Sequence, residues 1–292
     1  MLLTPAPDRT ALRLLLLLPL LIITWGCDDS VNPFVESDRY FSVFGALDMK
    51  ADTQYVRVIP LDTSLVVSEQ EPIDARVFLT DLNVGSTVEW TDSLFVFRDG
   101  SRGHVFYSPL RIQPEHRYRL EVVRSDGAAS VAETTVPAIP AAEIAEVNLL
   151  VYSSGRIEAV QNVTWSGVDR APAVVEMWYR FSGSPRSRFL DIRIEYPTED
   201  AAPSEPGWTV VTQLTQDRGR IGETIRPEDY LFLGMGMRIV VFDDQFLPPG
   251  GVFDPDILSQ PGAFSNVDNG FGFVGSVGRF DVEWVLDAET LA

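Results

Sequence analysis

From Tyr40 onward, apolar and polar residues alternate, and this period of two restricts the fold more than any other feature of the sequence. The stretch Arg117 to Val123 alternates almost throughout, and Ser125-Asp126-Gly127 after it is typical of a tight hairpin turn. Such alternation directs one set of side chains to a core and the other set to solvent. Strands are also expected at 40–44, 54–59, 76–80, 87–90, 94–97, 104–107 and 129–136.

Seven to eight short strands within about 100 residues predict a sandwich of two sheets. The segment Pro114 to Val122 resembles the corner before a late strand in fibronectin-type and immunoglobulin-like domains. In those domains a tyrosine entering the strand hydrogen-bonds back to upstream backbone, so the resemblance implies this role for Tyr118. The sequence therefore predicts an immunoglobulin/fibronectin-like β-sandwich over residues 39–138.

Two prolines in the segment 136–140, Val-Pro-Ala-Ile-Pro, remove backbone donors and mark the expected end of this first domain. Residues 141–292 are expected to form a second, mainly β domain, so the predicted fold class is all-β. No stretch of the chain shows convincing 3.6-residue periodicity, and residues 141–150 are the one candidate for a short helix. Strands are expected at 149–152, 158–165, 174–181, 188–196, 208–214, 230–233, 237–242 and 280–286.

Residues 1–26 have the pattern of a secretory signal peptide. Arg9 and Arg13 precede an apolar run from Leu14 to Ile23, which is shorter than the about 20 residues that a membrane-spanning helix needs. Gly26-Cys27 directly after this run resembles the lipobox of bacterial lipoproteins. The resemblance implies cleavage before Cys27, acylation of its thiol and its new amine, and a linker over residues 27–38.

Thr24 and Trp25 depart from the usual lipobox, which prefers leucine and a small residue at these positions. Ordinary cleavage to a free secreted protein and an uncleaved anchor therefore stay open as alternatives. The pair Asp28-Asp29 resembles an export signal to the outer leaflet in some Gram-negative lineages, whereas in others an Asp here retains the protein at the inner membrane. We expect a lipid-anchored protein of the cell outer membrane that faces the exterior.

The chain has 42 acidic and 23 basic residues, which give a net charge of −19. Loss of residues 1–26 removes two basic residues and one acidic residue and leaves a net charge of −20. Such a chain is not expected to bind nucleic acid, because phosphate backbones are held by clustered Lys and Arg. One Cys and two His also exclude a disulfide framework and a zinc site built from Cys and His alone.

No catalytic constellation is apparent in the sequence. A nucleophile paired with a base requires a His beside Ser or Cys. His104 lies in a predicted strand and His116 in a polar turn, so a structural or exposed role is expected for both. A glycosidase needs only two carboxylates, and this class stays open although no pair can be nominated. We therefore predict no catalytic residue, no cofactor and no metal site.

Two further groups of residues have both a functional and a structural interpretation. Asp243-Asp244 and Asp254-Pro255-Asp256 offer oxygen ligands for calcium, although their spacing fits no established loop and loop acidity accounts for them better. Five tryptophans are candidates for a sugar-stacking platform, although core packing is the expectation for residues within strand patterns. They are Trp90, Trp165, Trp178, Trp208 and Trp284.

Residues 263–275, Ala-Phe-Ser-Asn-Val-Asp-Asn-Gly-Phe-Gly-Phe-Val-Gly, form a distinctive motif. Together with 40–47 and 132–137, this motif resembles an uncharacterised family of bacterial lipoproteins that carry a domain of unknown function of the four-thousands series. The resemblance implies a β-sandwich first half and an association with TonB-dependent outer-membrane receptors. Asn269 stands where that family usually has Gly. The alternation of Gly and Phe over 270–273 suits a strand packed closely on another backbone.

The leading functional hypothesis is a non-catalytic β protein, anchored to the membrane by lipid at Cys27, that aids ligand capture or partners an outer-membrane receptor. A secreted carbohydrate-active enzyme that uses two carboxylates is the first alternative. A structural or adhesion module of the cell envelope is the second.

Overall fold

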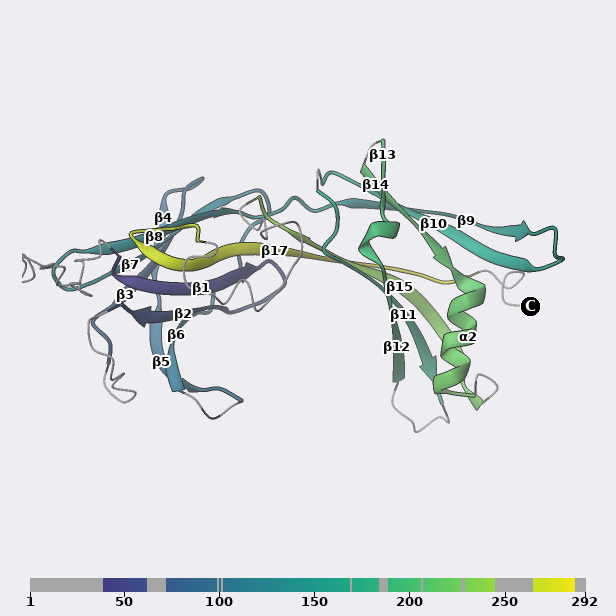
Figure 1. Cartoon of the computed structure of the whole chain (residues 1–292), viewed down its shortest axis with the longest axis horizontal. Helices are drawn as coiled ribbons and strands as arrows, with labels where there is room; N and C mark the ends of the chain where they lie inside the picture. Colours follow the sequence, from purple (N-terminus) through teal and green to yellow (C-terminus); the bar gives the residue numbers. More distant parts are fainter. Residues whose placement is uncertain are drawn as a thin grey trace, which may run out of the picture. The chain divides into compact units, whose positions relative to one another are not determined.

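The computed structural model describes residues 39–61, 72–98, 100, 102–168, 170–183, 189–205, 207–226, 229–244 and 265–286. Strands dominate these residues (Figure 1), and the prediction of an all-β fold is confirmed. The strands are β1 (Phe41–Asp48), β2 (Gln54–Pro60), β3 (Arg76–Asp81), β4 (Ser86–Glu89), β5 (Thr91–Val96), β6 (Arg102–Ser108), β7 (Arg117–Val123), β8 (Ala129–Thr135), β9 (Ala141–Val151), β10 (Ile157–Ser166), β11 (Val174–Ser182), β12 (Phe189–Tyr196), β13 (Ala202–Ser204), β14 (Gly207–Gln213), β15 (Leu231–Phe242), β16 (Val267–Asp268) and β17 (Gly270–Trp284).

The strands form three sheets. The largest has eight strands in the order β12-β11-β15-β17-β1-β2-β6-β5, the second has five in the order β16-β8-β7-β3-β4, and the third has four in the order β13-β14-β10-β9. Two helical segments accompany them among the described residues, η1 (Thr198–Asp200) and α2 (Leu214–Thr224).

The first hydrophobic core lies between β1, β2 and β6 of the eight-stranded sheet and β3, β7 and β8 of the five-stranded sheet, so this part of the chain is a β-sandwich. Alternation along each strand supplies its members, as in β7, where Leu120 and Val122 are buried and their neighbours point outward. Burial of each such side chain contributes roughly 1.5–3 kcal/mol. The largest members are Trp90, Tyr118, Phe41 and Phe106.

Tyr118 has the role that the immunoglobulin-like resemblance implies. Its side chain is buried at the start of β7, and its hydroxyl accepts a hydrogen bond of 2.9 Å from the backbone N–H of Gln113. A buried phenol with a satisfied hydroxyl fixes the course of the corner before the strand. This part of the fold prediction is confirmed.

The C-terminal glycine motif forms part of the first core. β17 pairs with β1 in parallel, with Gly270 opposite Phe41 and Gly272 opposite Val43. A Cβ atom on Gly270 would lie 2.6 Å from the carbonyl oxygen of Phe41, and one on Gly272 would lie 2.1 Å from that of Val43. The two backbones therefore approach so closely that only glycine fits, which confirms the expectation for residues 270–273.

A second hydrophobic core contains residues from β10, β11, β12, β14, β15 and α2. Trp165 and Val163 of β10 are fully buried in it, as are Met177 of β11 and Met235 and Met237 of β15. Most residues of the two cores fall on opposite sides of the segment 136–140, but Val267 and Val274 belong to the first core. The C-terminal residues thus return to the sandwich formed by the N-terminal ones.

Two local predictions in the second half are wrong. Residues 141–150 form strand β9 and no helix, because pairing with β10 outweighs the helical preference of their alanines and glutamates. Residues 214–224 form helix α2, which the sequence did not reveal. Only Asp217 and Ile221 of α2 are buried, so the helix has too narrow an apolar face to produce a 3.6-residue pattern.

Asp217 attaches α2 to the eight-stranded sheet. The carboxylate oxygen Oδ2 of Asp217 accepts hydrogen bonds from the hydroxyls of Tyr179 (2.5 Å) and Tyr196 (2.6 Å). The hydroxyl of Tyr196 in turn accepts the backbone N–H of Gln213, directly before the helix, at 2.9 Å. Burial raises the pKa of Asp217 above its ordinary value, and the hydrogen bonds from the two tyrosines offset this only in part.

Candidate functional site

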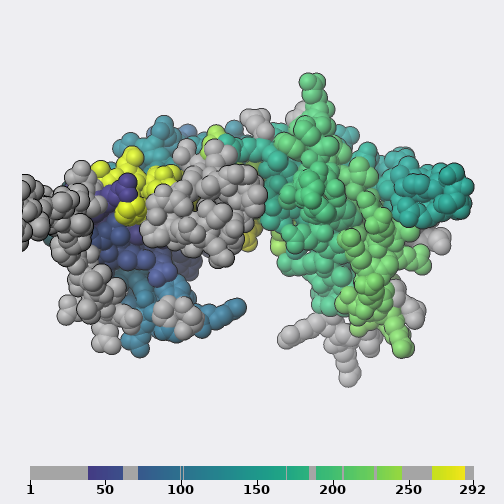
Figure 2. Space-filling view, in the orientation of Figure 1, coloured from purple at the N-terminus to yellow at the C-terminus, as the bar shows by residue number. Residues whose placement is uncertain are grey.

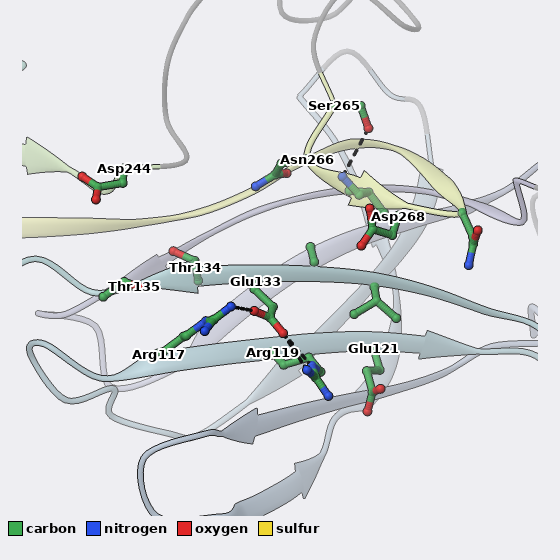
Figure 3. Close-up of a pocket in the computed structure, with 14 residues that line it drawn as sticks. Arg117, Arg119, Glu121, Glu133, Thr134, Thr135, Asp244, Ser265, Asn266 and Asp268 are labelled. Atoms are coloured by element: carbon green, nitrogen blue, oxygen red, sulfur yellow. Dashed lines mark hydrogen bonds and ion pairs between the residues drawn. The ribbon is translucent and has the colours of Figure 1, made fainter.

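A polar surface groove of about 920 Å³ lies along the outer face of the five-stranded sheet, where β7, β8 and β16 run side by side (Figure 3). Side chains from the two long strands form one side, and the segment before β17 forms the other. The lining residues are Arg117, Arg119, Glu121, Val131, Ala132, Glu133, Thr134, Thr135, Asp244, Ser265, Asn266, Val267, Asp268 and Asn269.

Strand alternation places the charged residues in the groove. In β7, Tyr118 and Leu120 point into the core, so Arg117, Arg119 and Glu121 point outward. In the antiparallel pairing of β7 with β8, Glu133 lies directly opposite Arg119. Opposite charges on directly paired residues stabilise a hairpin by roughly 0.2–1 kcal/mol.

Glu133 lies between two arginines (Figure 3). Its carboxylate accepts the Nε–H of Arg119 at 2.8 Å and also pairs with the guanidinium of Arg117. The hydrogen bond from Arg119 lowers the pKa of Glu133, and burial opposes this less strongly. Glu133 therefore stays ionised at neutral pH, which suits a fixed acceptor and does not suit a general acid.

Asn266 fixes the opposite side of the groove. Its side chain bridges to the backbone of Val274, donating from Nδ2 to the carbonyl oxygen at 2.6 Å and accepting the N–H at Oδ1 at 2.9 Å. Asn269 adopts a positive φ of 52°, and the hydroxyl of Ser130 on β8 donates to its carbonyl oxygen at 2.6 Å. This side of the groove is thus held by hydrogen bonds to both neighbouring strands.

The groove is polar and acidic. Four carboxylates and two guanidiniums line it, which gives it a net charge of −2. Both guanidiniums are engaged with Glu133, and the amides of Asn266 and Asn269 add neutral donors and acceptors. Such a surface favours a neutral or cationic polar ligand and disfavours an anionic one.

The two histidines have structural positions. Nδ1 of His104, on β6, lies 2.9 Å from the carboxylate of Asp92 on the neighbouring strand β5. Nδ1 of His116 lies 2.7 Å from Asp81, whose other carboxylate oxygen accepts backbone N–H groups in the turn after β3. Each histidine therefore joins two segments of the first half of the chain.

The acidic pair at the end of β15 is split between two environments. Asp243 is buried and accepts a hydrogen bond from the hydroxyl of Thr134. Asp244 is exposed and forms an ion pair of 2.6 Å with Arg170. Within the described part of the chain, no group of three or more His, Cys, Asp or Glu side chains is arranged to hold a metal ion. Asp254 and Asp256 lie outside the described residues.

The five tryptophans are buried or partly buried, and four of them belong to the cores, as expected from their strand positions. Trp90 is buried in the first core, and Trp165 is buried in the second, where Trp208 and Trp284 pack as partly buried residues. Trp178 is also buried, on β11.

The lipidation candidate Cys27 lies outside the described residues. No described helix has the length and apolar character required to cross a membrane.

Sequence patterns point to Asp244, as a candidate calcium ligand, and to Asp268, within the 263–275 motif, but not to the other charged residues of the groove, although a signal for some of these exists. A hairpin turn at residues 125–127 places Arg119 opposite Glu133 if the two strands pair symmetrically about it. The contribution of Ser265, Asn266 and Asp268 depends on the return of β16 to β8, which no local pattern reveals.

The chain is thus an all-β protein with a sandwich and a polar groove, and comparisons with known proteins add little to that class. No family model and no curated protein matches it. Among solved structures, it is similar to a pullulanase from Anoxybacillus sp. LM18-11, with 10% identity, a TM-score of 0.23 and coverage of 68% of this chain and 24% of that one. It is also similar to bovine butyrophilin, with 16% identity, a TM-score of 0.22 and coverage of 85% and 99%. These similarities are too low to carry a functional argument.

Proposed function

We propose that this chain is a non-catalytic binding protein of the bacterial outer membrane, anchored by lipid at Cys27, facing the exterior and accessory to ligand capture or to an outer-membrane receptor. The observation that carries the binding role is the groove, in which Glu133 is held ionised between Arg117 and Arg119. An ion pair of this kind offers fixed hydrogen-bonding groups to a ligand without supplying a proton for catalysis.

The anchor is supported by the sequence. Gly26-Cys27 follows a signal-like apolar run, and Asp28-Asp29 follows the cysteine. Two or three acyl chains on Cys27 would give stable attachment, whereas one chain gives only marginal binding, at about 0.8 kcal/mol per buried methylene.

Replacement of Cys27 by alanine is expected to abolish lipid attachment, because the thiol is the acylated group. Cells grown with radioactive palmitate should label the wild-type protein and leave Cys27→Ala unlabelled and in the soluble fraction. Proteinase treatment of intact cells then reports whether the wild-type protein faces the exterior. A wild-type protein that is unlabelled and freely soluble contradicts the anchor and leaves ordinary secretion as the explanation.

The groove predicts the class of ligand. In a thermal-shift screen of neutral, cationic and anionic polar compounds, the neutral or cationic class is expected to stabilise the protein, because the groove carries a net charge of −2. A ligand at 100 times its Kd raises the free energy of unfolding by about 2.7 kcal/mol. A double variant, Glu121→Lys with Asp268→Lys, reverses the charge of two groove acids and should shift the ligand preference toward anions.

The matched control for this screen is Glu199→Lys in η1, which changes the charge at a site that does not line the groove. The control should retain the wild-type ligand preference. An identical preference in the double variant, or stabilisation by anions alone in the wild type, contradicts ligand capture by the groove. A chain that no compound stabilises favours the structural or adhesion module.

A further inference from the structure

Strand β9 exposes apolar side chains. Among the described strands it is the edge strand of the four-stranded sheet, where Leu149 pairs with Ala159 and Val151 pairs with Ile157 of β10. The exposed fractions of Leu149 and Val151 are 67% and 72%. Large aliphatic side chains in a strand are ordinarily buried.

The neighbouring strand β10 extends this apolar surface. Ile157 of β10 lies opposite Val151 and is 54% exposed. The β9–β10 hairpin is visible at the surface as the teal segment at the right of Figure 2. A group of exposed aliphatic side chains on adjoining strands is unusual on a soluble surface and marks a site of interaction.

The hairpin is braced before any partner binds. At its tip, Glu158 accepts a hydrogen bond of 2.8 Å from the hydroxyl of Tyr152 and forms an ion pair of 3.0 Å with Arg156. From α2, Gln216 donates to Glu158 at 3.3 Å, and the hydroxyl of Thr215 accepts the backbone N–H of Ala159 at 2.8 Å. The edge is therefore preorganised, which lowers the entropy lost on binding.

The charges on β9 indicate what kind of partner binds at its edge. β9 carries two exposed acids, Glu143 and Glu146, and no basic residue. A second copy of the chain would bring the same acids and a similar net negative charge, which opposes self-association. A strand with basic side chains would instead be attracted to the edge.

We propose that the edge of β9 binds an extended segment of a partner protein, added as a fifth strand, with aliphatic and basic side chains at alternate positions. Backbone hydrogen bonds to the free edge supply affinity, the aliphatic side chains continue the surface of Leu149 and Val151, and the basic ones face Glu146. This inference concerns a surface separate from the groove and stands independently of the ligand-capture proposal.

The test uses the full chain in detergent micelles and a seven-residue peptide of alternating Val and Lys as the probe, in isothermal titration at 0.15 M salt. The peptide is expected to bind, and hydrogen exchange of the β9 amides should slow in its presence. Leu149→Lys is expected to weaken binding by about tenfold or more, since it interrupts the apolar surface and adds a repelling charge. Glu146→Lys should also weaken it.

Three controls separate strand addition from simple charge attraction. Val84→Lys, at a similarly exposed position outside the four-stranded sheet, should bind as the wild type does. A peptide with Glu in place of Lys, and one with every backbone nitrogen methylated, should not bind. Equal binding of the methylated peptide, or equal loss in Val84→Lys and Leu149→Lys, overturns the proposal. So does sedimentation of the free protein as a dimer that Leu149→Lys dissociates, because the edge then serves a second copy.

Discussion

Replacement of Gly272 by alanine is expected to lower the free energy of unfolding by about 4 kcal/mol or more, enough to prevent stable folding in many domains. The new Cβ atom would lie 2.1 Å from the carbonyl oxygen of Val43, and 2.9 Å from its carbonyl carbon. Backbone atoms cannot move aside as the end of a flexible side chain can. The φ of Gly272, +107°, adds strain for any residue with a side chain.

Urea denaturation of the wild type, Gly272→Ala and Gly127→Ala measures this effect. Gly127 also has a positive φ, +88°, but a Cβ atom there would meet nothing within 4 Å. Gly127→Ala therefore reports the conformational strain alone, which is about 1–2 kcal/mol. Equal losses in the two variants would show that β17 does not approach β1 as closely as described.

Replacement of Asp217 by alanine is expected to lower the free energy of unfolding by about 2–4 kcal/mol. Two buried hydroxyls, those of Tyr179 and Tyr196, lose their acceptor, and α2 loses its attachment to the sheet. Asp217→Asn retains one oxygen at the same position and should lose less. Thermal and urea unfolding followed by circular dichroism give both values, and Glu223→Ala, at an exposed position of α2, is the matched control.

The raised pKa of Asp217 predicts that the free energy of unfolding depends on pH. Burial raises the pKa of Asp217 in the folded protein, so the folded state binds this proton more tightly than the unfolded state. The stability that this preference contributes is complete below the ordinary pKa of Asp and is lost as pH rises through the raised value. The difference in unfolding free energy between the wild type and Asp217→Asn should therefore shift in favour of the wild type as the pH is lowered toward 4. A difference that is constant with pH contradicts a raised pKa.

Alternation and turn residues predict the strands of the first core well, because both depend on neighbouring residues. The resemblance of residues 114–122 to an immunoglobulin-like corner implies the hydrogen bond of Tyr118 to upstream backbone, which the structure contains. Local reasoning fails at 141–150, where the alanines and glutamates favour a helix and the pairing with β10 stabilises a strand. It fails at α2 because a helix that buries only Asp217 and Ile221 leaves no apolar period.

The groove could be predicted only in part. The outward direction of Arg117 and Arg119 follows from the alternation in β7, and their approach to Glu133 follows from the register of one hairpin. The other side of the groove requires β16 to pair with β8, over a sequence separation that no local signal spans. The glycine motif indicated a close backbone contact, but the identity of the partner strand, β1, is a property of the whole fold.

The pairing of β1 with β17 has a consequence for the order in which the chain folds. β1 is the first strand of the described chain and β17 is the last, so the sheet of the N-terminal sandwich is complete only once residues 270–277 have been synthesised. Contacts so distant in sequence slow folding. The first core therefore stays incomplete until these residues are available, and a premature stop before them would damage the N-terminal core.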